Sequence, residues 1–217
     1  MQLMNRLKYL YNPPAIIKKL FLDFIWNTSC GKVLLTFDDG PVKGSSEIIL
    51  NELNSNKVKA VFFCVGGNVN NNPELTQLIL NEGHTIANHT FNHKRLTKIS
   101  YDESVSEIVL FNKLMAEKFN YKVKFFRPPY GSFKLRTGSL LTGSSLKNVM
   151  WSLLTYDYKN DLKLVKFAVE KYLERNSIVV LHDSVKSKNI IRDSIKIIIE
   201  AASKKGFKIG EPDECLK

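Results

Sequence analysis

Short apolar runs alternate with longer amphipathic segments along most of the chain. The apolar runs have the length of buried strands and are predicted as strands at 33–37, 58–65, 85–87, 123–126, 149–153, 178–181 and 207–209. The amphipathic segments predict helices at 45–54, 73–82, 101–119, 162–174 and 190–204. A capping box from Ser100 to Glu103 marks the start of the longest helix. Residues 135–146 fit neither pattern well, because Gly138 and Gly143 interrupt any helix there.

This order of strand and helix predicts an α/β fold with a parallel sheet. About seven such units in one chain suggest a barrel-like arrangement. No linker, repeat or low-complexity stretch marks a second domain, so we expect one domain over residues 32–217.

The first 31 residues are expected to be a basic extension of that domain. Residues 1–19 are basic and residues 20–26 are mostly apolar, but Asp23 interrupts the apolar stretch and no small-residue cleavage site follows. Residues 27–30 make a poor lipobox, and no span of about 20 apolar residues exists to cross a bilayer. We therefore expect the extension to pack on the domain or to lie on a membrane surface. With no clear signal peptide, the expected location is the cytoplasm or the envelope of a bacterium.

The composition is that of an ordinary globular protein, with 44% hydrophobic and 24% charged residues and a mean hydropathy of -0.15. The formal net charge of +11 is compatible with an anionic partner, such as nucleic acid, a phosphate-bearing wall polymer or a lipid surface. It is equally compatible with a lysine-rich surface. Because no basic run is interleaved with aromatic residues, no nucleic-acid partner is expected, while peripheral contact with a membrane or an anionic envelope stays open.

The chain has three cysteines, Cys30, Cys64 and Cys215, without a C-x-x-C pair. This odd number predicts neither a disulfide framework nor a thiolate zinc site. Cys64 lies inside an apolar run and is expected to be a small buried thiol.

Ionisable residues follow four of the predicted strands. The stretch TFDDGP ends the first strand with two adjacent aspartates, and the other strand ends contribute these residues: Arg127, Asp157, His182 and Asp183. The Asp-Gly pair alone is also a common turn signal. The carboxyl ends of parallel strands converge on one face of a βα barrel, however, so four separate segments are expected to deliver charged groups to one site.

The stretch HTFNH places His89 and His93 four residues apart. On a helical turn this spacing would put both imidazoles on one face, within reach of one metal ion; an incidental pair at a solvated helix start is the alternative. A zinc site open to water needs a third ligand, which one aspartate of the doublet can supply while its neighbour acts as a base. The spacing does not say which aspartate does which. His84 precedes a predicted strand and is expected to be structural.

Four motifs in this order, TFDDGP, HTFNH, RPPYGS and VVLHDS, resemble those of the NodB-like polysaccharide deacetylases, carbohydrate esterase family 4. The resemblance covers about residues 32–209. It implies a distorted (β/α) barrel of seven or eight units, one divalent metal ion that is usually zinc, and removal of acetyl groups from N-acetylated sugars.

The resemblance also implies a role for each matching residue. Asp38 would be the general base, Arg127 would orient it, and the metal ligands would be Asp39, His89 and His93.

The remaining roles concern the leaving group and the oxyanion. The backbone amide of Tyr130 would help to bind the oxyanion, His182 would be the general acid, and Asp157 would steady that histidine. The fourth motif departs from the family, because Leu154 replaces the usual first aspartate and Tyr158 the usual tryptophan.

Three functions are compatible with these residues. The leading one is a metal-dependent N-deacetylase acting on a glycan, whose identity the sequence does not give. The alternatives are a zinc-dependent esterase that releases O-acetyl groups and a non-catalytic, basic glycan-binding protein.

Overall fold

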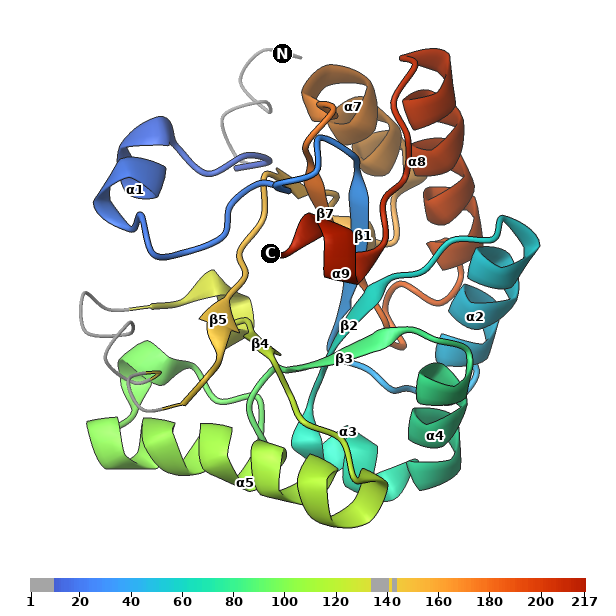
Figure 1. Cartoon of the computed structure of the whole chain (residues 1–217). Helices are drawn as coiled ribbons and strands as arrows, with labels where there is room; N and C mark the ends of the chain where they lie inside the picture. The colour runs from blue at the N-terminus through green and yellow to red at the C-terminus, as the bar shows by residue number, and fades with distance from the viewer. Residues whose placement is uncertain (1–9, 134–140, 142–143) are drawn as a thin grey trace.

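The computed structural model of the chain describes residues 10–133, 141 and 144–217. Within these residues all strands are parallel and form one curled sheet in the order β5-β4-β3-β2-β1-β7-β6 (Figure 1). The strands are β1 (Leu34–Asp38), β2 (Val61–Cys64), β3 (Thr85–Asn88), β4 (Phe125–Phe126), β5 (Lys147–Asn148), β6 (Leu153–Leu154) and β7 (Ile178–His182).

Helices cover the outer face of this sheet (Figure 1). They are α2 (Ser46–Ser55), α3 (Gly66–Asn71), α4 (Pro73–Asn81), α5 (Tyr101–Phe119), α7 (Leu162–Tyr172) and α8 (Ile191–Lys204). Two short helices lie elsewhere: α1 (Ala15–Leu20) packs on a separate apolar cluster, and α9 (Pro212–Cys215) packs on the inner face. Because side chains alternate along a strand, Leu35 and Phe37 of β1 point outward and pack in one apolar core with Ile49 of α2 and Ile195 of α8.

The alternate side chains of each strand point to the inner face of the sheet. Leu34, Phe63 and Ile178 form a second core there, which α9 closes with Cys215 and Leu216. This core lies inside the curled sheet, and the charged residues at the carboxyl ends of the strands line a cavity.

The structure confirms the parallel α/β architecture, in the form of a curled half-barrel. The strands β5 and β6 are its two edges and do not pair with each other within the described residues. The chain between them, residues 149–152, crosses from one edge to the other. The predicted strand at 149–153 is therefore wrong over most of its length, because Val149 makes only a single bridge, with Ile25, and only Leu153 enters β6.

The structure confirms one of the other expected elements and shortens another. Helix α5 begins and ends where its pattern indicates, and the Ser100 hydroxyl accepts a hydrogen bond from the Glu103 amide. The expected strand at 207–209 is reduced to one bridge between Val33 and Ile209. Most of the stretch at 135–146 lies outside the described residues.

The described part of the N-terminal stretch packs on the body of the protein. Tyr11 is buried, stacks on Tyr172 with ring centroids 5.3 Å apart, and accepts a hydrogen bond from the Leu154 amide. Phe24 and Trp26 are buried in a small cluster with Met150. None of the helices in the described ranges is long and apolar enough to cross a bilayer.

Cys30 and Cys215 form a disulfide across a sequence separation of 185 residues. The expectation that the cysteines form no disulfide is therefore wrong. The fold brings the segment before β1 alongside the end of the chain, where the Ser29 amide donates to the Cys215 carbonyl. A pairing this distant has no local sequence signal. Cys64 is a buried free thiol, as predicted.

Candidate active site

A cavity of about 590 Å³ lies at the carboxyl ends of the strands. The residues that the sequence singles out for chemistry converge on it from separate segments, and its lining includes Asp38, Asp39, His89, His93, Tyr130 and His182. Arg127 and Asp157 do not line the cavity; they are fully buried behind it and contact residues that do.

The two aspartates point in different directions because the strand ends between them. Asp38 is the last residue of β1, and the alternation along the strand directs its side chain to the inner face of the sheet. Asp39 has a left-handed backbone with φ of 79°, and its amide donates to the Phe63 carbonyl at 3.1 Å. The doublet therefore supplies two separate carboxylates to the cavity, as the turn at the strand end requires.

Gly40 is required by close packing. A Cβ atom at this position would lie 2.2 Å from Oδ2 of Asp183, which is buried directly after His182. The Asp183 amide donates to the Asp38 carbonyl at 2.8 Å, and the Ser46 hydroxyl donates to the Asp183 carboxylate. These contacts fasten the end of β1 to the end of β7.

Asp39, His89 and His93 form a group of ligand atoms that lie within 4.8 Å of one another. Nε2 of His93 is 3.1 Å and Nε2 of His89 is 3.7 Å from Oδ1 of Asp39. The Nδ1 atom of His89 lies 2.7 Å from the Arg127 carbonyl, to which it donates, so its Nε2 is left as a ligand facing the cavity. Two imidazoles and one carboxylate are a donor set that zinc favours.

The electrostatics of this group favour its ligand forms. Burial lowers the pKa of His89 to about 4, so its imidazole is neutral at physiological pH. Burial alone would raise the pKa of Asp39, but the hydrogen bond from His93 and the nearby histidines lower it well below its ordinary value. His89 and Asp39 are therefore already in the forms that bind a cation at neutral pH.

The helical turn expected at 89–93 is wrong. These residues form a loop in which Thr90 and His93 adopt left-handed backbones, with φ of 66° and 55°. The loop folds back on itself, so the two imidazoles still approach, with ring centroids 5.0 Å apart.

Arg127 is a fully buried cation that fixes Asp38. Its Nη1 donates to Oδ1 of Asp38 at 2.6 Å and to the Thr36 hydroxyl at 2.9 Å. Its Nε and Nη2 donate to the carbonyls of Val149 and Met150 at 2.9 and 2.7 Å. With one carboxylate oxygen occupied, the other oxygen of Asp38 faces His89, where Oδ2 lies 4.0 Å from Nε2.

His182 and Asp157 form the second charged pair. Nδ1 of His182 donates to Oδ1 of Asp157 at 2.7 Å, and the His182 amide donates to Oδ2 at 2.7 Å. Burial on its own would lower the pKa of His182, but Asp157, with smaller contributions from Asp39 and Asp38, raises it to about 9. This imidazole is therefore protonated at neutral pH.

The turn at Tyr130 completes one side of the cavity. Tyr130 and Gly131 both have left-handed backbones, with φ of 59° and 58°, and a Cβ on Gly131 would lie 2.2 Å from the Trp151 ring. The backbone amides of Gly131 and Ser132 donate to carbonyls within the turn. The backbone amide of Tyr130 makes neither of these two hydrogen bonds.

Several lining residues were not singled out by the sequence. Trp151 packs beside the buried Arg127, with its ring centroid 5.9 Å from the guanidinium carbon, and Arg95 lies 4.5 Å above the Tyr130 ring. The only feature of the sequence that could have pointed to Trp151 is its position just before the fourth motif. No feature of the sequence pointed to Arg95. The two residues that depart from the family pattern, Leu154 and Tyr158, both line the cavity.

A second group of ligand-type residues, Cys30, Glu214 and Cys215, lies at the far end of the sheet. Its two thiols are joined in the disulfide and are not available to a metal ion. His84 is buried away from the cavity and accepts a hydrogen bond from the Ala60 amide.

Comparison with known proteins gives the family of this chain. The profile of the polysaccharide deacetylase family matches residues 26–149. A peptidoglycan-N-acetylglucosamine deacetylase of Bacillus cereus is 35% identical over 149 residues, which are 69% of this chain but only 54% of that relative. The chain thus matches about half the length of this relative.

Solved structures share the fold over most of the chain. A peptidoglycan N-acetylglucosamine deacetylase in complex with an N-oxidanyl-benzamide has a TM-score of 0.82 and 29% identity, and the match covers 88% of this chain and 91% of that one. A mutant of a CE4 family pseudoenzyme with restored enzymatic activity has a TM-score of 0.78 and 26% identity, covering 89% of this chain and 71% of that one. The family thus includes a pseudoenzyme, so catalysis depends on which residues a member carries at its site. By its matched profile and its fold, this chain belongs to the polysaccharide deacetylase family.

Proposed function

We propose that the chain is a metal-dependent hydrolase that removes acetyl groups from N-acetylated sugars of a glycan, with residues 32–217 as its catalytic domain. The observation that carries this proposal is the convergence of three kinds of group on one cavity. These are the ligand set Asp39, His89 and His93, the carboxylate of Asp38 and the imidazolium of His182.

The ligand set fits one divalent cation, with zinc the favoured ion. The hydrogen bond from His89 Nδ1 to the Arg127 carbonyl fixes the tautomer, and the low pKa values of His89 and Asp39 keep both in the binding form. When bound, the cation would supply Lewis acidity to the acetyl carbonyl oxygen and to the attacking water.

Asp38 is the proposed general base. Arg127 holds its Oδ1, so Oδ2 is the oxygen that can accept a proton from water on the cavity side. The water oxygen then forms a bond to the acetyl carbon. The backbone amide of Tyr130 is proposed to donate to the oxyanion that develops on the carbonyl oxygen.

His182 is the proposed general acid. Its Nδ1 proton is committed to Asp157, so Nε2 carries the proton that can pass to the departing nitrogen as the carbon–nitrogen bond breaks. The products are the free amine on the sugar and acetate. A leaving amine needs this proton more than a leaving alcohol does, so a strongly protonated His182 favours amide hydrolysis over the release of O-acetyl groups.

The apolar lining suits the acetyl methyl group. Leu154 and Val180 line the cavity beside the edge of Tyr158, whose ring centroid is 4.7 Å from that of His182. We propose that Tyr158 forms the wall that a tryptophan forms elsewhere in the family. A smaller and more polar wall leaves the chemistry intact and changes which sugars fit.

Metal content and acetate release, measured on the same protein preparations, test the proposal. The wild type should hold one divalent ion and release acetate from N-acetylglucosamine oligomers. Asp38→Asn should keep the ion and lose rate by about 10²- to 10⁴-fold, because positioned proton transfer contributes that much. Asp39→Asn should lose the ion itself. Asp193→Asn, an exposed carboxylate on α8, is the matched control and should match the wild type.

Three results would contradict the proposal. Full activity after exhaustive chelation would exclude metal dependence. Wild-type rates in Asp38→Asn would exclude the assigned base. Release of acetate from O-acetylated sugars only, with none from N-acetylated ones, would favour the esterase, and no turnover of either would favour a glycan-binding protein.

A further inference from the structure

Exposed apolar side chains gather at α1 and the residues that follow it. Ile16 and Leu20 of α1 are 67% and 65% exposed, and Leu22 just beyond is 81% exposed. Together with the exposed Lys19 these residues form what we call the α1 patch. Leu22 has the largest exposed fraction of any large apolar side chain in the described residues.

The two faces of α1 are both apolar. Ile17, together with Phe21 just past the helix end, packs against the buried cluster of Phe24 and Trp26. Ile16 and Leu20, also four residues apart, share another face that points away from the body. A surface helix ordinarily places polar residues on its outer face, so the outer face of α1 lacks the partner that its sequence calls for.

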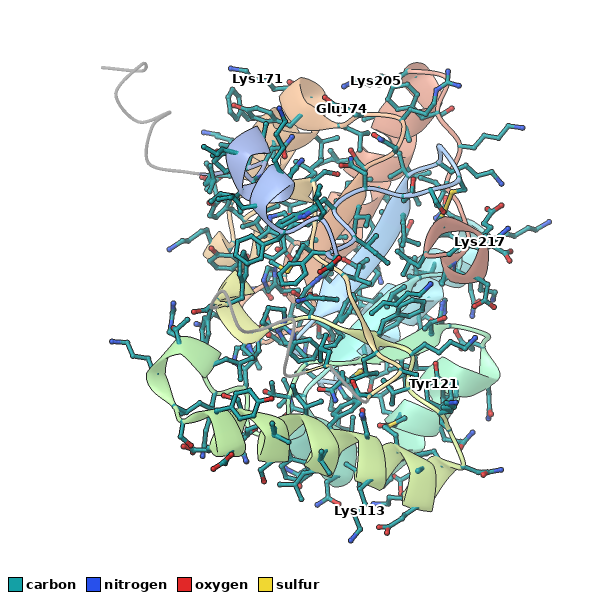
Figure 2. All side chains as sticks on the ribbon, turned by 60° about the vertical axis from the view of Figure 1, so that its left-hand side comes forward. Lys113, Tyr121, Lys171, Glu174, Lys205 and Lys217 are labelled. Carbon is teal, nitrogen blue, oxygen red and sulfur yellow. A yellow bond between two sulfur atoms is a disulfide. The ribbon has the colours of Figure 1, made fainter. Side chains whose placement is uncertain are left out.

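The N-terminal stretch that contains the patch has more basic than acidic residues. Lys18 and Lys19 lie in α1, which contains no acidic residue. The sequence before α1 adds Arg6 and Lys8, and Asp23 is the sole acidic residue in the first 26. Lysines elsewhere are spread over the molecule, with Lys113 at one end and Lys171 and Lys205 at the other (Figure 2).

We infer that the α1 patch docks on the surface of a membrane that contains anionic lipids. Exposed isoleucine and leucine side chains enter the boundary between headgroups and acyl chains, while neighbouring lysines bind anionic headgroups. The six residues of α1 lie on such a surface and are too few to cross it. Figure 1 shows α1 at the periphery of the molecule, apart from the strands of the sheet.

Charge also decides between a membrane and a second copy of the chain. Two copies that met patch to patch would bring like-charged lysines together, which opposes association. An anionic bilayer has the opposite charge and offers an apolar layer beneath it. The membrane is therefore the partner that satisfies both features of the patch.

Docking at α1 would place the membrane next to one wall of the cavity. Phe21 contacts Phe133 with ring centroids 4.6 Å apart, and Phe133 follows the turn at Tyr130 and Gly131. Trp151 packs against the same cluster and lines the cavity. The catalytic cavity thus lies within one layer of aromatic side chains of the docking segment.

Vesicle sedimentation with the full chain tests this inference. The wild type should bind vesicles of phosphatidylglycerol and phosphatidylcholine at least about tenfold more tightly than vesicles of phosphatidylcholine alone. The triple variant Ile16→Ser/Leu20→Ser/Leu22→Ser should lose at least about tenfold in affinity for the anionic vesicles, because three inserted side chains are removed. Lys19→Gln should lose about fivefold.

The chain offers a matched control on α5. Val109 and Leu110 are neighbouring apolar residues that are 53% and 44% exposed, so Val109→Ser/Leu110→Ser removes similar surface away from α1 and should bind as the wild type does. Circular dichroism checks that each variant is folded, and Lys19→Gln carries the test if the triple variant is not.

Two sets of results would overturn the inference. One is a wild type that fails to bind anionic vesicles, or an α5 control that loses as much affinity as the α1 variant. The other is a triple variant that binds vesicles normally but changes from dimer to monomer by light scattering, which would assign the patch to self-association.

Discussion

Replacing Asp157 with asparagine should change the pH at which His182 loses its proton. In the wild type the carboxylate of Asp157 accepts hydrogen bonds from both Nδ1 and the amide of His182. Asparagine keeps the size of the side chain and one acceptor but removes the negative charge. The variant therefore isolates the electrostatic contribution of Asp157 to the pKa of His182.

The size of the effect follows from the site. The His182 pKa of about 9 lies above the ordinary value of 6.5, although burial alone would lower it. A difference of about 2.5 in pKa corresponds to roughly 3 kcal/mol of preference for the charged form. Asp157 is the largest of the groups that raise the pKa, with Asp39 and Asp38 adding to it, so Asp157→Asn should lower the pKa by about 1 to 2.

The same shift has a consequence for stability. A histidine whose pKa is raised in the folded state stabilises the fold below its unfolded pKa near 6.5, and that contribution is lost as the pH rises through about 9. The unfolding free energy of the metal-free wild type should therefore fall between these pH values by up to roughly 3 kcal/mol. In Asp157→Asn this fall should be much smaller.

NMR titration of the imidazole signals in metal-free protein is the direct assay. His84, whose pKa burial lowers to about 4, is an internal control that should titrate identically in both proteins. If His182 is the acid of the proposed deacetylase, the alkaline limb of kcat/KM should also move to lower pH, because the acid must be protonated to act. If His182 titrates in Asp157→Asn as it does in the wild type, the reasoning about this pair is refuted.

Two further predictions concern the frame around the site. Replacing both disulfide cysteines, Cys30→Ser/Cys215→Ser, should lower the free energy of unfolding by about 2–4 kcal/mol in urea titrations, and equal midpoints with and without reductant would contradict a structural disulfide. Gly40→Ala should lower both activity and melting temperature, because the added Cβ would lie 2.2 Å from the Asp183 carboxylate. The control Gly67→Ala should leave both near the wild-type values, because its Cβ would make only an ordinary contact at 3.6 Å.

The sequence predicted well what depends on local periodicity and on parallel topology. Helix α5 has the bounds that its pattern indicates, and residues at the ends of β1 and β7 meet because parallel strands end on the same side of a sheet. The pairing of Asp38 beside His182 in the register of these strands is a direct consequence.

Features that depend on single backbone angles or on distant contacts were not predictable. The approach of His89 and His93 rests on left-handed backbones at Thr90 and His93, which the residue types do not require. The disulfide joins segments that only the complete fold brings together. The interruption between β5 and β6 coincides with hydrogen bonds from Arg127 to the carbonyls of Val149 and Met150, which are then not available for strand pairing.

The two-residue edges of the curled sheet also bear on how the protein behaves at high concentration. An edge strand with free amides and carbonyls is a template for pairing with another chain, and long edges invite aggregation. In the described part of this sheet both edges, β5 and β6, are two residues long. The β5 edge is further covered, since the Ile25 amide donates to the Asn148 carbonyl and the Met150 amide donates to the Ile25 carbonyl. A second molecule would find almost no strand to extend, so an open sheet can carry the candidate active site without exposing a site for strand addition.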